Sequence, residues 1–153
     1  MKATDLMCGD WVLINGTPHK IQAIDSIDEE IQTDDDLYYI GEDRYHSEDK
    51  IEGIPITPEI LERNGFNPDT FLTAEWKKEV YFKEFSSCVV EPDDSGKYIF
   101  GTTIYWNKKD ADGSPIDCGT MYESMIYNLQ YIRELQHALR LCGLNELADN
   151  FKI

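Results

Sequence analysis

The sequence lacks the cysteine patterns that hold a metal or build a disulfide framework. Its four cysteines are scattered over 153 residues and include no CxxC pair, and they are Cys8, Cys88, Cys118 and Cys142. Zinc sites and small disulfide-stapled folds both depend on close, regular cysteine spacing. The cysteines are therefore predicted to be free thiols, and no metal or other cofactor is expected.

Long apolar runs are missing as well. No stretch approaches the roughly 20 apolar residues that a membrane-spanning helix needs, and the first ten residues lack the apolar core of a secretion signal. The sequence thus predicts a cytoplasmic protein without membrane contact. A chain of this length buries about two-thirds of its unfolded surface, which is enough for one domain or two small ones.

Basic residues are scarce, because 14 Lys and Arg stand against 30 Asp and Glu and give a net charge of -16. Residues 1–50 carry -9 and residues 51–153 carry -7, so both parts repel a phosphate backbone. Nucleic acid is therefore not an expected partner. The local exceptions are two basic pairs beside tryptophan, Lys77-Lys78 and Lys108-Lys109, and they are better interpreted as solvated ends of strands or loops.

No catalytic constellation is present in the sequence. His19, His46 and His137 are far apart along the chain, and Ser86-Ser87 has no nucleophile-elbow context. A glycine-rich phosphate loop is also missing. No catalytic residue is assigned.

Three acidic patterns suggest a metal site, and each fails on its details. Aligning Gly113 with the invariant glycine of a calcium loop puts Lys108 at the first ligand position. The acidic cluster over residues 25–36 is typical of solvated turn carboxylates. Glu134 and His137 have the spacing of a di-iron ligand pair, but no second copy exists. We therefore interpret His137 as a surface histidine.

The N-terminal part, over residues 1–56, carries the signals of short strands and tight turns. Trp11 to Ile14 is a β-branched and aromatic run, and Asn15-Gly16 tolerates the positive φ of a hairpin turn. The return strand is predicted from His19 to Asp25, after which strands follow at 30–33, 37–40 and 50–56. Five short strands predict a closed or nearly closed barrel, since closure removes unpaired edges, and the rhythm GDWV…G…I..I resembles that of an SH3-like barrel. Gly9-Asp10 is interpreted as a simple turn before the first strand.

Residues 57–153 predict a second, α+β lobe. Thr57, Pro58 and Asn64-Gly65 start and stop a short helix, and Asn67-Pro68-Asp69 indicates a loop. An antiparallel meander is expected from Glu79 to Trp106, with a further strand over 120–127. The predicted fold class is α+β, with an SH3-like domain at 1–56 and, at 57–153, an antiparallel sheet packed by one long helix.

That long C-terminal helix is the clearest element in the sequence. Asn128 is a candidate N-cap, Gly143 is the stop, and apolar residues recur at spacings of three or four, namely Leu129, Ile132, Leu135, Leu139 and Cys142. Leu135 is predicted to be core, whereas its neighbour Gln136 is predicted to point elsewhere and to tolerate alanine. Residues 149–153 are left as either an edge strand or a frayed tail.

Three segments carry a resemblance to a known family. The opening from Asp5 to Ile24, IPITPEILERNGF in the middle and LQYIRELQHALRLCGL near the end resemble a family of small uncharacterised proteins encoded by phages and mobile elements of gut anaerobes. Members similar to this chain start with "DL..G.WV" and finish with a "YVHELQ" helix, where Arg133 stands in place of the histidine. The resemblance implies the architecture and a mobile-element origin, and it implies no activity or site residue.

Tyrosine is abundant, with nine copies in the chain. Sheet packing with wet hydroxyls is the simpler interpretation. The functional alternative is a protein-interaction face, because tyrosine is enriched in interfaces. The residues proposed for that face are Tyr38, Tyr39, Tyr45, Tyr105 and Trp106.

The leading hypothesis is a non-enzymatic interaction or accessory protein with an unidentified protein partner, and self-association is left open. The alternative is an acidic mimic of nucleic acid that occupies a host DNA-binding protein. A small hydrolase ranks third. Mimicry predicts carboxylates arrayed at the phosphate spacing of a duplex, whereas an interaction module predicts an exposed apolar or aromatic patch.

Overall fold

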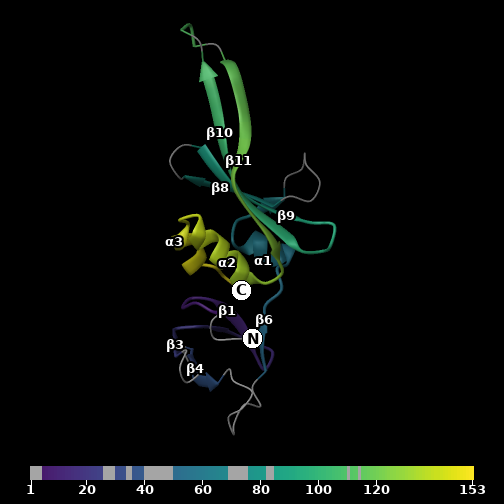
Figure 1. Cartoon of the computed structure of the whole chain (residues 1–153), viewed down its shortest axis with the longest axis vertical. Coiled ribbons are helices and arrows are strands. Elements are labelled where there is room, and N and C mark those ends of the chain that lie inside the picture. Colours follow the sequence, from purple (N-terminus) through teal and green to yellow (C-terminus); the bar gives the residue numbers. More distant parts are fainter. Residues whose placement is uncertain are drawn as a thin grey trace. The chain divides into compact units, whose positions relative to one another are not determined.

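The computed structural model describes residues 5–25, 30–33, 36–39, 50–68, 76–81, 85–109, 111–113 and 115–153. These residues form a mixed α+β fold with three antiparallel sheets (Figure 1). The chain divides into two compact units, unit 1 (Met1–Ile56 with Tyr131–Ile153) and unit 2 (Thr57–Gln130). The boundary after Ile56 coincides with the predicted one. The C-terminal segment belongs to unit 1, however, and not to the second lobe in which the sequence had placed it.

The first sheet of unit 1 has the order β2-β1-β6. Its strands are β1 (Trp11–Ile14), β2 (Thr17–Lys20) and β6 (Ile51–Gly53). Asn15 and Gly16 have φ values of 52° and 81°, the left-handed conformation that a two-residue hairpin turn requires. The predicted first hairpin is therefore confirmed.

The second sheet of unit 1 contains β3 (Ala23–Asp25), β4 (Glu30–Gln32) and β5 (Leu37–Tyr39). The predicted return strand is divided between the two sheets. The Ile21 amide donates to the carbonyl of Asp10 at 2.9 Å, and the next amide, of Gln22, donates to Gln32 at 2.7 Å. The chain thus changes sheets at this bend, as corner strands do. The described strands form two sheets and no closed barrel, so the SH3-like barrel stays a prediction.

The core of unit 1 lies between these elements. Its buried cluster consists of Leu6, Val12, Ile14, Ile21 and Ile31, with Ile24, Tyr38 and Ile51 packed against it. The alternation along β1 explains this arrangement, since every second side chain of a strand points to the same face. Tyr38 also lies against the His19 ring, with the ring centroids 5.5 Å apart.

Unit 2 begins with helix α1 (Pro58–Arg63), which confirms the predicted short helix. The Thr57 hydroxyl accepts a hydrogen bond from the Ile60 amide at 3.4 Å, and Pro58 occupies the first turn, where its missing N–H costs nothing. The Asn64 amide donates back to the carbonyl of Ile60, and Gly65 follows with a φ of 78°. The start and stop signals in the sequence therefore act as expected.

The sheet of unit 2 has the order β11-β10-β9-β8-β7. Its strands are β7 (Asn67–Pro68), β8 (Trp76–Tyr81), β9 (Phe85–Pro92), β10 (Tyr98–Lys109) and β11 (Pro115–Leu129). The predicted meander and the strand over 120–127 are confirmed. The predicted loop at Asn67-Pro68 is instead a short edge strand paired with β8, a position that proline tolerates.

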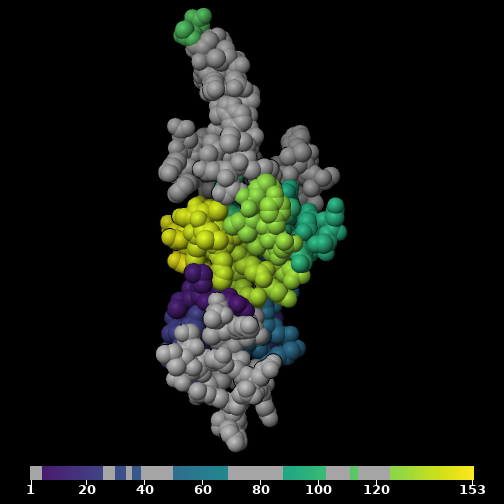
Figure 2. Space-filling view, viewed as in Figure 1, coloured from purple at the N-terminus to yellow at the C-terminus, as the bar shows by residue number. Residues whose placement is uncertain are grey.

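Strands β10 and β11 extend beyond their neighbour. Strand β9 pairs with β10 only as far as Ile104, whereas the pairing of β10 with β11 continues to Lys109. The outer part is therefore a two-stranded ribbon, and its tip residues, Ala111 to Gly113, lie at the far end of the hairpin (Figure 2). At the other end of β10 the Ser95 hydroxyl bonds to Asp93 and keeps the pKa of that carboxyl below its ordinary value.

Helix α2 (Ile132–Leu141) is shorter than the sequence predicts. Asn128 is not its N-cap, because that residue has a φ of 64° and the following Leu129 still pairs with Tyr98 in the sheet. The N-cap is Tyr131. Ile132, Leu135 and Leu139 are buried along α2, which confirms the middle of the predicted apolar stripe. Its two ends lie outside the helix, because Leu129 belongs to β11 and Cys142 is the partly buried C-cap.

The chain ends in a second helix of unit 1, α3 (Asn145–Asp149). The expected edge strand or frayed tail at 149–153 is therefore wrong, because Asp149 ends a helix and Phe151 is buried. Gly143 has a φ of 78° and makes the sharp turn between α2 and α3. The two helices contact each other.

The described residues can be compared with the predictions for the cysteines and for membrane-spanning segments. Three of the cysteines are described with their side chains, and they are thiols: Cys8 is exposed, Cys88 is buried and Cys142 is partly buried. In this part of the chain, no helix is both long and apolar enough to cross a membrane.

We expect Leu135→Ala to lower the free energy of unfolding by about 2–5 kcal/mol, because it removes a fully buried side chain and leaves a cavity. Leu141→Ala is the matched control, since Leu141 lies on the same helix and is 79% exposed. The control should change stability by about 0.5 kcal/mol or less. Urea denaturation measures both values, and equal effects would show that the packing of α2 is assigned wrongly.

Candidate functional site

A buried carboxylate connects the loop before β1 to helix α2. The side chain of Asp10 is fully buried, and its Oδ2 accepts a hydrogen bond from the Met7 amide at 2.8 Å. The same oxygen lies 2.7 Å from Nε2 of His137, and Oδ1 lies 2.8 Å from Nη1 of Arg140. Gly9-Asp10 is thus more than the simple turn that the sequence predicted. His137 is partly buried and paired, which corrects its interpretation as a surface histidine.

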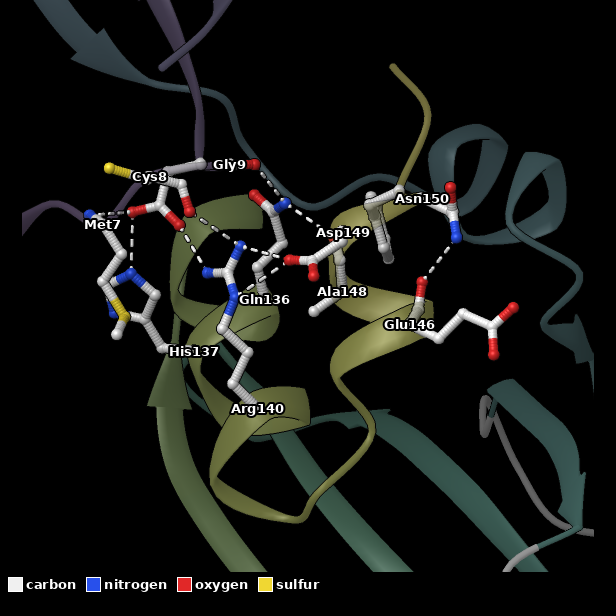
Figure 3. A network of polar contacts seen from close by, with 12 residues as sticks. Met7, Cys8, Gly9, Gln136, His137, Arg140, Glu146, Ala148, Asp149 and Asn150 are labelled. Atoms are coloured by element: carbon white, nitrogen blue, oxygen red, sulfur yellow. Dashed lines mark hydrogen bonds and ion pairs between the residues drawn. The ribbon is translucent and has the colours of Figure 1, made fainter. Parts of the chain in front are cut away.

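Arg140 extends this network to the end of the chain (Figure 3). Its Nη2 lies 3.1 Å from Oδ1 of Asp149 and donates to the carbonyl of Cys8 at 3.3 Å. One guanidinium therefore joins helix α2, helix α3 and the loop before β1. Because Asp10 has all its partners within the protein, we interpret this network as structural.

Gln136 makes a second connection beside the first. Its side chain is fully buried, and Oε1 accepts from the Trp11 amide at 3.1 Å. Nε2 donates to the carbonyls of Gly9 and Ala148 at 2.9 Å each (Figure 3). The prediction that Gln136 points away from the core is therefore wrong. Its spacing from Ile132, four positions earlier, was the available signal, since residues four apart share a helix face.

The start of α2 lies beside the segment that follows strand β6. The Ile132 amide donates to the carbonyl of Ile54 at 2.8 Å, and Pro55 forms an antiparallel bridge with Tyr131. The Glu134 carboxylate accepts from the Tyr131 amide at 3.1 Å and satisfies one of the free donors of the first turn. The two segments, which are far apart in the sequence, thus share one surface of unit 1.

A cavity of about 510 Å³ opens between these segments, and we call it the β6–α2 recess. This volume falls in the range of roughly 300–1,000 Å³ that is typical of ligand sites. Every lining residue belongs to unit 1. The recess is lined by Asp5, Leu13, Ile51, Glu52, Gly53, Pro55, Tyr131 and Arg133.

Arg133 is the unusual residue of the recess. Its side chain is only 13% exposed, and its Nη1 is buried without a hydrogen-bond partner among the described residues. The guanidinium lies over the Tyr131 ring, 4.8 Å from the centroid, and Nη2 has a long ion pair of 3.5 Å with Glu134. A buried donor without an acceptor costs about 1–3 kcal/mol. The protein therefore holds an unfavourable group at this place.

The backbone at Gly53 is adapted to this arginine. A Cβ atom at position 53 would overlap the guanidinium of Arg133 and the ring of Tyr131. Only glycine leaves room for both groups against strand β6. The position of the guanidinium is thus set by the strand as well as by the helix.

Carboxylates supply the opposite charge at the recess. Asp5 and Glu52 both line it and are both exposed. Glu52 pairs with Lys50 at 2.9 Å, and these side chains are 46% and 73% exposed. Exposed pairs of this kind contribute about 0–1 kcal/mol, so an incoming ligand can replace Lys50 easily. The recess therefore offers a donor, acceptors and the apolar side chains of Leu13, Ile51 and Pro55.

The aromatic residues proposed from the sequence are divided between the two units. Tyr38 and Tyr39 lie in β5 of unit 1, and Tyr105 and Trp106 lie in β10 of unit 2, whereas Tyr45 is outside the described residues. Tyr38 is half-buried against the core. A single interaction face built from these residues stays a prediction.

Among the described residues, no group of three or more His, Cys, Asp or Glu side chains could hold a metal ion. The composition of the recess, with the Arg133 guanidinium, two carboxylates and apolar walls, suits binding. In the sequence, Arg133 stands out only as a departure from the pattern of the family that the sequence resembles. Its burial depends on the approach of β6, which the local sequence does not indicate. No family model, curated protein or solved structure matches this chain.

Proposed function

We propose that this protein is a non-enzymatic binding protein and that it binds another protein through the β6–α2 recess. The observation that carries the proposal is the buried Nη1 of Arg133, which has no partner in the described part of the chain. Proteins keep few such groups, and those that persist call for a specific explanation. A ligand that supplies the acceptor would remove the cost, and this gain would contribute to binding.

A protein segment fits the recess better than a phosphate-bearing ligand does. Asp5 and Glu52 stand at the recess, and unit 1 contains 17 acidic and 7 basic residues, a net charge of -10. Such a surface repels phosphate groups. A polypeptide, in contrast, offers carbonyl acceptors, apolar side chains and positive charge together. We also propose a cytoplasmic location, as the lack of long apolar runs in the sequence predicts, and, on the basis of the resemblance, a role as an accessory factor of a phage or mobile element.

We also propose that the six strands of unit 1 form an SH3-like barrel. The pairing orders β2-β1-β6 and β3-β4-β5 support this proposal, together with the bend at Ile21-Gln22, where one strand passes from the first sheet to the second. Hydrogen exchange tests it. If the barrel forms, the amides that join β2 to β3 will be protected as strongly as those of β1, and a fully exchanging bend would contradict it.

A ligand-binding Arg133 predicts a distinctive effect on stability. We expect Arg133→Met to leave the free energy of unfolding unchanged or to raise it by about 1–2 kcal/mol, because the substitution removes a buried donor that has no partner among the described residues. Urea denaturation gives this value. Arg140→Met is the comparison and should destabilise, since Arg140 pairs with the buried Asp10. A loss of more than about 1 kcal/mol for Arg133→Met would indicate a structural role instead.

Affinity capture from the cells that encode the protein tests the function itself. Three tagged baits are compared: the parent, a recess variant with Arg133→Met and Glu52→Gln, and a control variant with Arg63→Met and Glu62→Gln. Glu62 and Arg63 are exposed on α1 of unit 2, so the control makes the same chemical changes away from the recess. We expect one protein on the parent and control baits and its loss from the recess variant. Equal capture by all three baits, or capture of no protein, would contradict the proposal.

The acidic mimic remains a second candidate, which the net charge of -16 favours. Under this proposal the captured partner is itself a DNA-binding protein, and duplex DNA competes for it. Adding duplex DNA to the capture experiment separates the two candidates. Release of the partner by DNA from the parent bait supports mimicry, and retention opposes it.

A further inference from the structure

We propose that the β6–α2 recess binds a basic peptide segment of the partner, in which a main-chain carbonyl accepts from Arg133 and a Lys or Arg side chain pairs with Glu52. This inference rests on the proposed function and names the chemistry of the partner. It follows from the charges around Nη1 of Arg133, for which the described residues supply no acceptor, because these charges disfavour a negatively charged acceptor from the ligand.

The acceptor for Arg133 should be neutral. Glu134 already compensates the guanidinium charge through the 3.5 Å ion pair with Nη2. A ligand carboxylate would therefore gain little at Nη1, and it would be repelled by Asp5 and Glu52 at the same recess. A carbonyl oxygen satisfies the N–H without this repulsion. Every peptide carries such carbonyls along its main chain.

The guanidinium can reach such a carbonyl by a small movement. Nη1 is covered where it lies, but Arg133 lines the recess, and its ion pair with Glu134 is long. A side-chain rotation could turn Nη1 toward the recess. This rotation would break no hydrogen bond of Nη1 to the described residues, because Nη1 has none there. The Tyr131 ring beneath the guanidinium supports its plane during this change.

We infer the positive charge of the peptide from Glu52. This carboxylate is 46% exposed and is held by Lys50, itself 73% exposed, so a ligand cation can take over the pair at small cost. The net charge of -10 on unit 1 favours a basic ligand at longer range and increases its rate of association. Leu13, Ile51 and Pro55 provide apolar surface for the aliphatic part of a lysine or arginine.

Selection from a displayed library of random peptides tests the inference without knowledge of the partner. The full chain is the target, and synthetic copies of the enriched peptides are titrated against the parent, the recess variant and the control variant defined above. We expect the enriched peptides to carry an excess of Lys and Arg. They should bind the recess variant at least about tenfold more weakly than the parent, the loss expected for a hydrogen bond to a charged group. The control should bind like the parent.

A second variant, Gly53→Ala, tests the recess without changing a charged residue. Gly53→Ala places a Cβ atom where the guanidinium of Arg133 and the Tyr131 ring lie, and it should also weaken binding by about tenfold or more. Circular dichroism melts show whether each variant is folded, and only folded variants are compared. Raising the salt concentration should weaken peptide binding to the parent, because exposed charge pairs are screened.

The outcomes separate the inference from the proposed function. Enriched peptides that are neutral or acidic, equal affinity for the parent and the recess variant, or no enrichment at all would each overturn the basic-peptide assignment. If affinity capture still finds a protein that depends on the recess, the proposed function stands and only the partner chemistry is wrong. If capture finds no such protein, the proposed function itself has failed.

Discussion

Gln136→Leu is expected to lower the free energy of unfolding by about 3–5 kcal/mol, because each backbone group left without a partner in a buried place costs about 1–3 kcal/mol. The substitution keeps most of the side-chain volume but removes all three hydrogen bonds of the amide, to the Trp11 amide and the carbonyls of Gly9 and Ala148. The effect should be concentrated in unit 1, because all three partners lie there.

Gln22→Leu is the control for this prediction. Gln22 lies in the same unit with an exposed side chain, so the same chemical change should alter stability by about 0.5 kcal/mol or less. Urea denaturation gives the two free energies, and hydrogen exchange of the Trp11 amide reports whether β1 has lost its connection to α2. If both variants unfold like the parent, the buried amide contributes nothing to joining these elements.

Asp10→Asn is expected to cost about 3–5 kcal/mol, because it removes the buried partner of an ion pair and leaves Arg140, which is 13% exposed, with the exposed Asp149 as its counter-ion. The variant has nearly the same shape, but the charge that faces Arg140 and His137 is gone, and one of the two acceptor oxygens becomes an NH2 group, which cannot accept from the Met7 amide or from Arg140. Urea denaturation measures the loss. The loop before β1 should also become the least protected part of unit 1 in hydrogen exchange.

Asp149→Asn provides an internal comparison, because Asp149 pairs with the same arginine. Asp149 is 60% exposed, whereas Asp10 is fully buried. The exposed carboxylate should therefore contribute about 0–1 kcal/mol in the same denaturation experiment. If the two substitutions had equal effects, burial would not decide the strength of these pairs, and the role assigned to Asp10 would be wrong.

The two variants also test how the recess is built. Gln136 and Asp10 do not line the recess, yet they hold α2 against the start of β1, and α2 carries Arg133. We expect Gln136→Leu and Asp10→Asn to weaken partner capture because they destabilise unit 1. Arg133→Met, in contrast, should weaken capture without lowering the free energy of unfolding. This contrast separates positioning of the helix from contact with the partner.

Local signals in the sequence were sufficient for most individual elements. The Asn15-Gly16 turn, the Thr57-Pro58 start of α1 and the apolar stripe of α2 each depend on residues that are close neighbours along the chain. Backbone preferences and capping act over such distances, so they can be read from the chain alone. The predicted start of the last helix was wrong because Asn128 has a positive φ and is followed by Leu129, which still pairs with Tyr98 in the sheet.

The sequence by itself determined the acidic charge, the scattered cysteines, the α+β class and the places of most turns, because these follow from composition and from neighbours along the chain. Only the tertiary structure decided that residues 131–153 join the N-terminal unit, that Gln136 and Asp10 are buried connectors, and that Gly53 covers Arg133. These contacts join segments that lie far apart along the chain. The free energy of such contacts depends on burial, which no local pattern specifies, and the candidate site is built from them.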